Sequence, residues 1–429
     1  MHKWFSKRTI QLVNRPPPSQ PEDFSDLFVL VLKCFRQFGL STVQVTAVKG
    51  QPKFVTSRGL VVLVAFVLVV TWAALVGSFF LQYNTAMITG IANHIQFITN
   101  VVALTATLIV PMFKCSELNE MLVDFCVIDA ELNYFNVKLP HWQHKSGFMR
   151  CYVVHLLFLI ITASFDGYVL LIMSKETPLW LWFFHLLPFA LYSLAFMNAF
   201  TMIRWVKIRI QHVNMLIEQY QKFPLFDEVG RSKFRLTSVV MMNGVEESSI
   251  NNRILMIVSR TIDLATRLES YNGLLFLFGY LALFCVTTIQ VYYCYLHVFI
   301  GIPGQSFSVY SFVLSLVIIV GNLFAILSIP YICEQVGNES KKLLSYLSKL
   351  SMRYGQSVHS SVWFPNLISS VKFSALGFFN INYNMLSSFF AALITYLIIF
   401  IQFNSIVTND EKTGQATRSG KANHRPTEY

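Results

Sequence analysis

Seven runs of apolar residues, each long enough to cross a lipid bilayer, dominate this sequence. They cover about 59–81, 88–112, 149–173, 178–203, 272–300, 307–332 and 384–406. A helix needs about 20 such residues to cross a hydrocarbon core of ~30 Å. Only 13% of the residues are charged, roughly half of the share that is usual in soluble domains. The pattern predicts an all-α membrane protein with seven transmembrane helices.

The distribution of positive charge predicts the orientation of these helices. Most of the 33 Lys and Arg residues lie in segment 1–58 and in the regions after the second, fourth and sixth runs. The short connections QYNTAM and GIPGQSF carry no positive charge. Because positively charged loops stay on the cytoplasmic side, we expect a cytoplasmic N-terminus and an extracellular C-terminus. G-protein-coupled receptors have the opposite orientation.

The polar ends of the chain give no sign of a further folded module. Segment 1–58 contains RPPPSQPED and has no apolar stretch near Met1, so a secretory signal is not expected and the first run is interpreted as a membrane anchor. Residues 407–429 have little pattern and are expected to form an extracellular disordered tail. The net charge of +11 follows from the orientation, and without a basic face on a folded module no nucleic-acid partner is expected.

Signatures of enzymes and of metal sites are missing from the sequence. It contains no P-loop, no G-x-S-x-G, no H-E-x-x-H and no G-x-G-x-x-G pattern. Intramembrane proteolysis would need a pair of acids or a Ser/His pair within the runs, and Asp166 is the one central acid. The seven cysteines show no zinc-ligand spacing, and none falls in an expected external loop. We therefore expect no enzyme, no metal, no cofactor and no extracellular disulfide.

Two cytoplasmic regions continue the helical pattern of the neighbouring runs. Before the fifth run, apolar side chains recur at three- and four-residue steps, at Ile250, Ile254, Ile257, Thr261, Leu264, Leu268 and Tyr271. After the sixth run, Leu343, Leu347 and Leu350 lie on one helical face. This spacing is typical of amphipathic helices. We expect the later helices to extend into the cytosol and to pack against one another there.

The last run has two different faces. Small and polar side chains form a polar stripe at helical spacing, consisting of Ser388, Ala392, Thr395, Ile399 and Gln402. A bulky stripe lies beside it, consisting of Phe390, Leu393, Leu397 and Phe400. In lipid, a polar stripe indicates either close packing against another helix or the wall of a water-filled path. The spacing alone leaves both interpretations open.

A motif in the same run resembles a signature of insect gustatory receptors. Thr395-Tyr396, five hydrophobic residues and then Gln402-Phe403 reproduce the TYhhhhhQF pattern of that family. The preceding stretch KFSALGFFNINYNMLSSFFAA is also similar to the family's C-terminal region. The motif covers only a short part of the chain, while the number and the orientation of the expected helices extend the resemblance to the whole of it.

The resemblance implies a ligand-gated, non-selective cation channel, built as a homo- or heterotetramer and related to insect odorant receptors. In that family the seventh helix of each subunit lines a central pore. Carried over, Gln402 would form a polar ring, Ile399 an apolar constriction, and Thr395 would lie deeper on the same face. Tyr396 and Phe403 would pack around the pore helix. The resemblance also implies a multi-pass location in the plasma membrane.

The implied division of the chain has five parts. Segment 1–58 is cytoplasmic, and 59–333 holds the first six helices with the ligand-binding bundle in their outer half. Residues 334–383 form cytoplasmic anchor helices, 384–406 form the pore helix, and 407–429 form the tail.

The family binds small-molecule tastants within each subunit, in the outer half of the helix bundle. The expected orientation places a set of polar and aromatic residues at that depth: Asp166, His94, His185, Trp182, Gln290, Tyr293, His297 and Tyr310, with Trp180 adding aromatic surface. An ionisable group inside a membrane span is a candidate for function. Each of these side chains is alternatively satisfied by a neighbouring helix or belongs to an interfacial aromatic belt.

The class of ligand is less constrained. Sugar receptors of the family usually carry an acid directly after the Thr-Tyr pair, and this chain has Leu397 there. A bitter-type or orphan receptor is therefore favoured, with a fructose-like sugar receptor as the alternative. A transporter, a metabotropic seven-span receptor and a non-sensory membrane protein are the alternatives from other classes.

Overall fold

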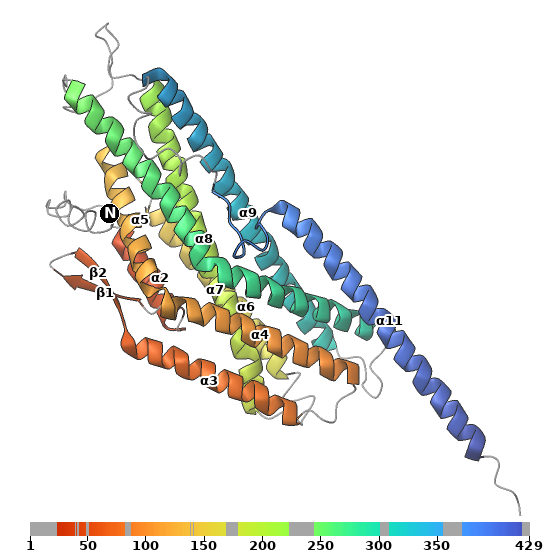
Figure 1. Cartoon of the computed structure of the whole chain (residues 1–429). Coiled ribbons are helices and arrows are strands. Elements are labelled where there is room, and N and C mark those ends of the chain that lie inside the picture. The colour runs from red at the N-terminus through yellow and green to blue at the C-terminus, as the bar shows by residue number, and fades with distance from the viewer. Residues whose placement is uncertain are drawn as a thin grey trace, which may run out of the picture.

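A computed structural model describes residues 24–38, 40, 43–48, 51–81, 87–137, 139, 141–168, 179–222, 244–300, 309–354 and 371–422. Seven helices of this described part are long and apolar enough to cross a membrane. They are α3 (Arg58–Leu81), α4 (Met87–Phe113), α6 (His141–Gly167), α7 (Leu179–Lys222), α8 (Gly244–Tyr295), α9 (Val309–Tyr354) and α11 (Tyr383–Ala422). The predicted all-α fold class with seven transmembrane helices is confirmed (Figure 1).

The cytoplasmic extensions that the sequence predicts are continuous with the membrane helices. α7, α8 and α9 contain 44, 52 and 46 residues. At about 1.5 Å per residue, each is at least twice as long as the hydrocarbon core is thick. The faces expected to pack are indeed buried, as Ile257, Leu268 and Leu343 show with at most 1% of their surface exposed. Side chains of Ile250 and Leu350 lie outside the described residues.

In the part of the chain that the structure describes, two further helices and one hairpin lie at the cytoplasmic end. α2 (Phe24–Arg36) precedes the first membrane helix, and α5 (Cys115–Tyr134) connects α4 to α6. Strands β1 (Val43–Val48) and β2 (Gln51–Thr56) pair antiparallel, with Val48 opposite Gln51. No regular structure was predicted for segment 1–58, and the structure shows α2 and this hairpin there. The strands are rich in β-branched residues, which favour extended backbone.

The helices differ in how much of their surface the rest of the chain covers. In the apolar stretches of α4, α7 and α8 61% of the residues are buried, whereas the share falls to 6% in α11. The cytoplasmic half of α7 supplies the centre of the core, with Ile203, Val206, Ile210, Val213 and Ile217 fully buried at steps of three and four residues. α11 therefore lies at the periphery of the subunit and projects beyond the other helices (Figure 1).

The tail after residue 406 differs from the expectation. α11 continues without a break to Ala422, so the predicted disordered tail is wrong for the residues up to that point. The segment contains no proline before Arg425, and extending a helix that already exists needs no new nucleus.

Candidate functional site

The orientation of α11 separates its two stripes. On the bulky stripe Leu393 is buried, and Phe390, Leu397 and Phe400 are half-buried. The ring of Phe400 lies 5.4 Å from that of Tyr292 on α8, and Phe389 lies 5.4 Å from Phe284 of the same helix. α8 is thus the helix against which the bulky stripe packs.

The polar stripe points away from the subunit. Ser388, Thr395, Ile399 and Gln402 are exposed, and Ala392 is half-buried. The Thr395 hydroxyl donates to the carbonyl of Ala391 at 2.9 Å, which satisfies it within the helix. Among the described residues, the helices of this chain leave Ser388, Thr395 and Gln402 exposed, so packing between these helices does not account for the polar stripe.

The two other motif residues lie at the edge between these faces. Tyr396 is 51% exposed, and its ring lies 5.6 Å from Phe284 in an edge-to-face arrangement. Phe403 is 60% exposed. Tyr396 therefore contacts the helix bundle with one edge only, and most of its surface and that of Phe403 remain available to a neighbour.

A tight turn before α11 fixes the start of this helix. The backbone N–H of Ala375 donates to Phe379 at 2.9 Å, and that of Ile381 donates to Phe373 at 2.8 Å. Gly377 has a φ of 81°, a conformation that glycine adopts without steric cost. Leu376 shares the left-handed region with a φ of 53°, so this turn holds a branched side chain in a costly backbone state.

The same turn is attached to both α8 and α9. The Ser374 hydroxyl donates to the Glu269 carboxylate at 2.6 Å, and the Val371 N–H donates to the Ser340 hydroxyl at 3.2 Å. The Leu376 side chain lies over Gly273, where an added Cβ would meet its Cδ2 at 2.8 Å. The pore-helix candidate is therefore held through its bulky stripe and through this turn.

Near the extracellular end, polar side chains of α4 and α8 meet. Gln290 donates to Gln96 at 3.3 Å in a buried pair, and the Tyr293 hydroxyl donates to Asn93 at 2.6 Å. Asn100, one turn further along α4, is fully buried, and its amide has no hydrogen-bond partner among the residues that the structure describes. Unsatisfied buried amides are costly, so this cluster has capacity for a ligand or for water.

A second group lies where α6 ends and α9 begins. Asp166 is buried with 8% of its surface exposed. Two residues later, the ring of Tyr168 lies 4.5 Å from that of Tyr310 on α9. The predicted residues Asp166 and Tyr310 are thus brought to the same end of the same helix pair.

The remaining predicted ligand-binding residues belong to neither of these two groups of contacts. His94 on α4 is half-buried, and so is His297 in the short π-helix η2 (Leu296–Ile300) that continues α8. His185, Trp182 and Trp180 belong to α7, and their side chains lie outside the described residues.

The polar residues on the α4 side of this cluster were not among the predicted ligand-binding residues. Asn93, Gln96 and Asn100 follow one another at steps of three and four residues, which places them on one helical face. This spacing can be recognised in the sequence, and it identifies the face of α4 that packs against α8. Asn322 of α9 was also missed, and it donates to the Thr287 hydroxyl of α8 at 3.2 Å.

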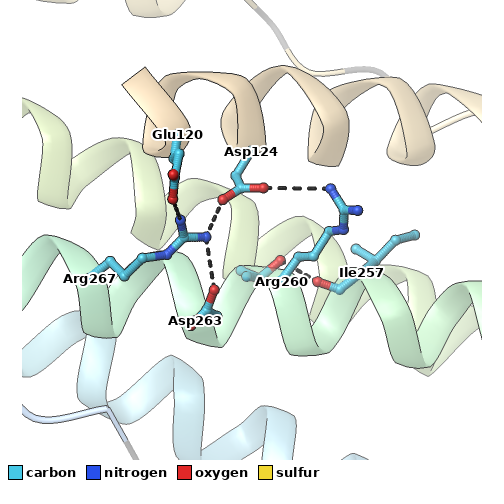
Figure 2. Close-up of polar contacts among 7 residues, drawn as sticks. Glu120, Asp124, Ile257, Arg260, Asp263 and Arg267 are labelled. Atoms are coloured by element: carbon cyan, nitrogen blue, oxygen red, sulfur yellow. Dashed lines mark hydrogen bonds and ion pairs between the residues drawn. The ribbon is translucent and has the colours of Figure 1, made fainter. Parts of the chain in front are cut away.

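At the cytoplasmic end, ion pairs join α5 to α8. Figure 2 shows Arg267 between the carboxylates of Glu120, Asp124 and Asp263, with Arg260 on the other side of Asp124. Burial raises the pKa of the Asp124 carboxyl, and the positive charge of Arg267 opposes this rise. The two helices are therefore connected through the largely covered Asp124, Arg260 and Arg267, with the exposed Glu120 and Asp263 at the edge.

A second pair attaches α5 to α7 inside the protein. Arg209, 2% exposed, donates from Nε and Nη2 to both oxygens of Asp129 at 2.9 and 2.7 Å. Its guanidinium also lies 4.5 Å from the ring centre of Phe125. Such a two-pronged geometry fixes orientation as well as charge. α5 thus ties together the cytoplasmic parts of the two central helices.

These features define a class of protein before any comparison is made. Seven membrane-spanning helices, long cytoplasmic extensions and a peripheral last helix with an outward polar stripe describe a multi-pass membrane protein. A sequence profile of the 7tm chemosensory receptor family matches residues 30–406. Because this match spans most of the chain, the protein belongs to that family.

Individual relatives agree with this assignment. Gustatory receptor 23a of Drosophila melanogaster is 29% identical over 146 residues, which cover 31% of this chain and 39% of that receptor. The alignment thus spans well under half of the relative's length. The insect olfactory receptor OR5 of Machilis hrabei has a similar fold, with a TM-score of 0.56 at 14% identity, covering 87% of this chain and 97% of the other. Its complex with eugenol matches with a TM-score of 0.51 at 12% identity over the same shares.

Proposed function

We propose that this protein is a gustatory receptor that acts as a ligand-gated, non-selective cation channel in the plasma membrane. The family assignment and the TYhhhhhQF motif in α11 support a chemosensory role. A small-molecule tastant opens the channel by binding in the outer half of the helix bundle. Four subunits, identical or drawn from related receptors, surround one central pore.

The orientation of α11 is the observation that carries this proposal. Other weakly covered helices expose apolar side chains, as α3 does with Val62, Phe66 and Val69. α11 exposes Ser388, Thr395 and Gln402 as well, beside apolar side chains such as Ile394 and Ile398. A stripe of polar side chains is unfavourable against hydrocarbon, whereas it suits the wall of a water-filled pore between subunits. Gln402 then forms a polar ring, with Ile399 as the apolar constriction beneath it.

Ligand binding is assigned to the two polar groups at the extracellular end. The buried Gln290 and Asp166 offer hydrogen-bonding groups within an otherwise apolar helix bundle, which is typical of small-molecule sites. Capture of eugenol by a receptor of the same fold is consistent with a small ligand. Leu397 after the Thr-Tyr pair favours a bitter-type or orphan ligand. A fructose-like sugar receptor of the same family is the alternative.

The pore assignment is tested by cysteine accessibility. Gln402→Cys should be modified by a membrane-impermeant thiol reagent applied from outside, and the modification should reduce tastant-evoked current. Phe400→Cys is the matched control, because its side chain faces Tyr292 of α8 and should stay unmodified. If Gln402→Glu also leaves cation permeation unchanged and Gln402→Cys does not react, α11 does not line the pore.

A transporter or a metabotropic receptor is the alternative outside this class. Epitope tags at the two ends of the chain in intact cells decide first, because an external N-terminus contradicts the channel proposal. Expression of this chain alone, with recording of tastant-evoked cation current, then separates a channel from a non-sensory membrane protein of the same fold.

A further inference from the structure

The arginines near the cytoplasmic membrane boundary fall into two sets. Those facing α5 are paired: Arg209 with Asp129, Arg260 and Arg267 with Asp124. Arg150 of α6 and Arg204 of α7 are exposed, and neither forms an ion pair with a carboxylate of the described residues. The difference between the sets is not one of charge but of the surroundings that each side chain faces.

Both unpaired arginines lie at the depth where hydrocarbon ends. Between Arg150 and Asp166 the sequence contains no Asp, Glu, Lys or Arg, and the same holds from Thr177 to Ile203, directly before Arg204. Each arginine is therefore the charged residue that bounds an uninterrupted membrane span on its cytoplasmic side. Side chains at this depth meet the headgroups of the inner leaflet.

The two arginines belong to the surface of α6 and α7 around Gly147. The Nη1 and Nη2 atoms of Arg204 lie 3.8 and 3.9 Å from the position that a Cβ would take at Gly147 of α6. Arg150 follows Gly147 by three residues, so the two positions lie on the same face of α6, about one helical turn apart. Its Nε donates to the carbonyl of Ser146 at 3.4 Å, which directs the guanidinium back toward this turn. Arg204 thus contributes its positive charge at Gly147, and Arg150 contributes a second one from the next turn of α6, so an anion bound here is attracted by both.

The surface directly above this pair is apolar and open to lipid. Only 17% of the apolar stretch of α6 is buried, and Val153, Val154 and Leu157 are 48, 65 and 53% exposed. Phosphate oxygens suit the forked geometry of guanidinium groups. An acyl chain attached to that phosphate would run along these exposed side chains. We propose that Arg150 and Arg204 bind the headgroup phosphate of an anionic phospholipid of the inner leaflet at Gly147.

Photo-crosslinking in defined membranes tests the site without any channel recording, so its failure is distinguishable from failure of the proposed function. The full chain is reconstituted in phosphatidylcholine vesicles doped with photoreactive phosphatidylserine, or in the same vesicles doped with photoreactive phosphatidylcholine. Phosphatidylserine should label the α6 peptide that contains Val153 and Val154 several times more strongly. One cation beside an anionic membrane surface contributes ~1 kcal/mol, so each arginine removed should lower this labelling about fivefold.

Variants decide whether the labelling reflects a site. Arg150→Gln and Arg204→Gln should each lower phosphatidylserine labelling of this peptide, while Arg204→Lys should retain part of it. Arg58→Gln is the matched control, because Arg58 is an exposed cation at the start of another membrane helix, α3. Equal labelling by the two lipids, or an equal loss in Arg58→Gln, overturns the proposal in favour of general surface attraction. Should one glutamine variant not fold, the variant of the other arginine, compared with Arg58→Gln, decides.

Discussion

The contact between Gly273 and Leu376 predicts that the effect of Gly273→Ala on stability changes sign when Leu376 is also substituted. Gly273 lies in α8, and Leu376 belongs to the turn before α11. A Cβ added at Gly273 would approach Leu376 Cδ2 to 2.8 Å, Cγ to 3.2 Å and the backbone nitrogen to 3.4 Å. Rotation of the Leu376 side chain relieves the first two approaches. The third is an ordinary van der Waals distance.

Two effects of opposite sign determine the result of Gly273→Ala. Alanine is better than glycine inside a helix by about 1 kcal/mol. Overpacking at a close contact costs about 1–3 kcal/mol. The substitution should therefore be neutral to moderately destabilising in the unaltered chain. In a Leu376→Ala background the close contact is gone, and the same substitution should stabilise the protein by about 1 kcal/mol.

Thermal unfolding of the purified receptor in one detergent measures all four members of this double-mutant cycle. The coupling between the two positions should amount to about 1–3 kcal/mol. Gly279→Ala is the matched control, because a Cβ there would lie 2.4 Å from Phe196 of α7 and not against the turn. Leu376→Ala should leave the effect of Gly279→Ala unchanged.

The reasoning is refuted if Gly273→Ala raises the unfolding temperature equally in both backgrounds. Leu376 would then not lie over Gly273, and the turn would not be attached to α8 at this position. Rescue of Gly279→Ala by Leu376→Ala would show instead that the second substitution loosens packing generally.

Other substitutions test the cytoplasmic ion pairs and the proposed ligand site. Asp129→Ala leaves Arg209, 2% exposed, without its buried partner, so unfolding stability should fall by about 3–5 kcal/mol. Glu131→Ala removes the more exposed pair with Arg253 and should cost at most about 1 kcal/mol; equal losses would contradict the assigned burial. Asp166→Asn should shift the tastant concentration response at unchanged single-channel conductance, and a changed conductance with normal sensitivity would refute its role in ligand binding.

Helical spacing predicted those parts of the fold and site that depend on one element. The alternation of the polar and bulky stripes in α11 requires only a helix, and the structure turns Leu393 inward and Thr395 outward as that spacing implies. The buried faces of the cytoplasmic extensions follow in the same way. Helical spacing does not predict the surroundings of each stripe, because the sequence contains no information on what covers an exposed stripe.

Contacts between side chains of distant elements could not be predicted from helical spacing. Arg267 and Asp124 are far apart in sequence, and nothing local distinguishes Arg267, which meets carboxylates of α5, from Arg204, which faces outward. The turn that carries Leu376 in a left-handed conformation was equally hidden, since leucine does not signal that state as glycine or asparagine would. Such features depend on tertiary contacts that select among locally equivalent residues.

On the proposed function, α8 is the element through which a ligand would act on α11. Its neighbouring residues Tyr292 and Tyr293 face different partners: Tyr293 donates to Asn93 of α4, while the ring of Tyr292 stacks near Phe400 of α11. A ligand that replaces the hydrogen bond to Asn93 changes the position that α8 favours, provided it binds the two positions with different affinity. Because Phe400 precedes Gln402 by only two residues, a shift of Tyr292 reaches the proposed pore wall within the same helical turn. The turn at Ser374 and Leu376 holds the start of α11 to the same helix, and Phe389 and Tyr396 contact Phe284 of α8 in between. On the proposed function, a shift of α8 therefore carries α11 with it.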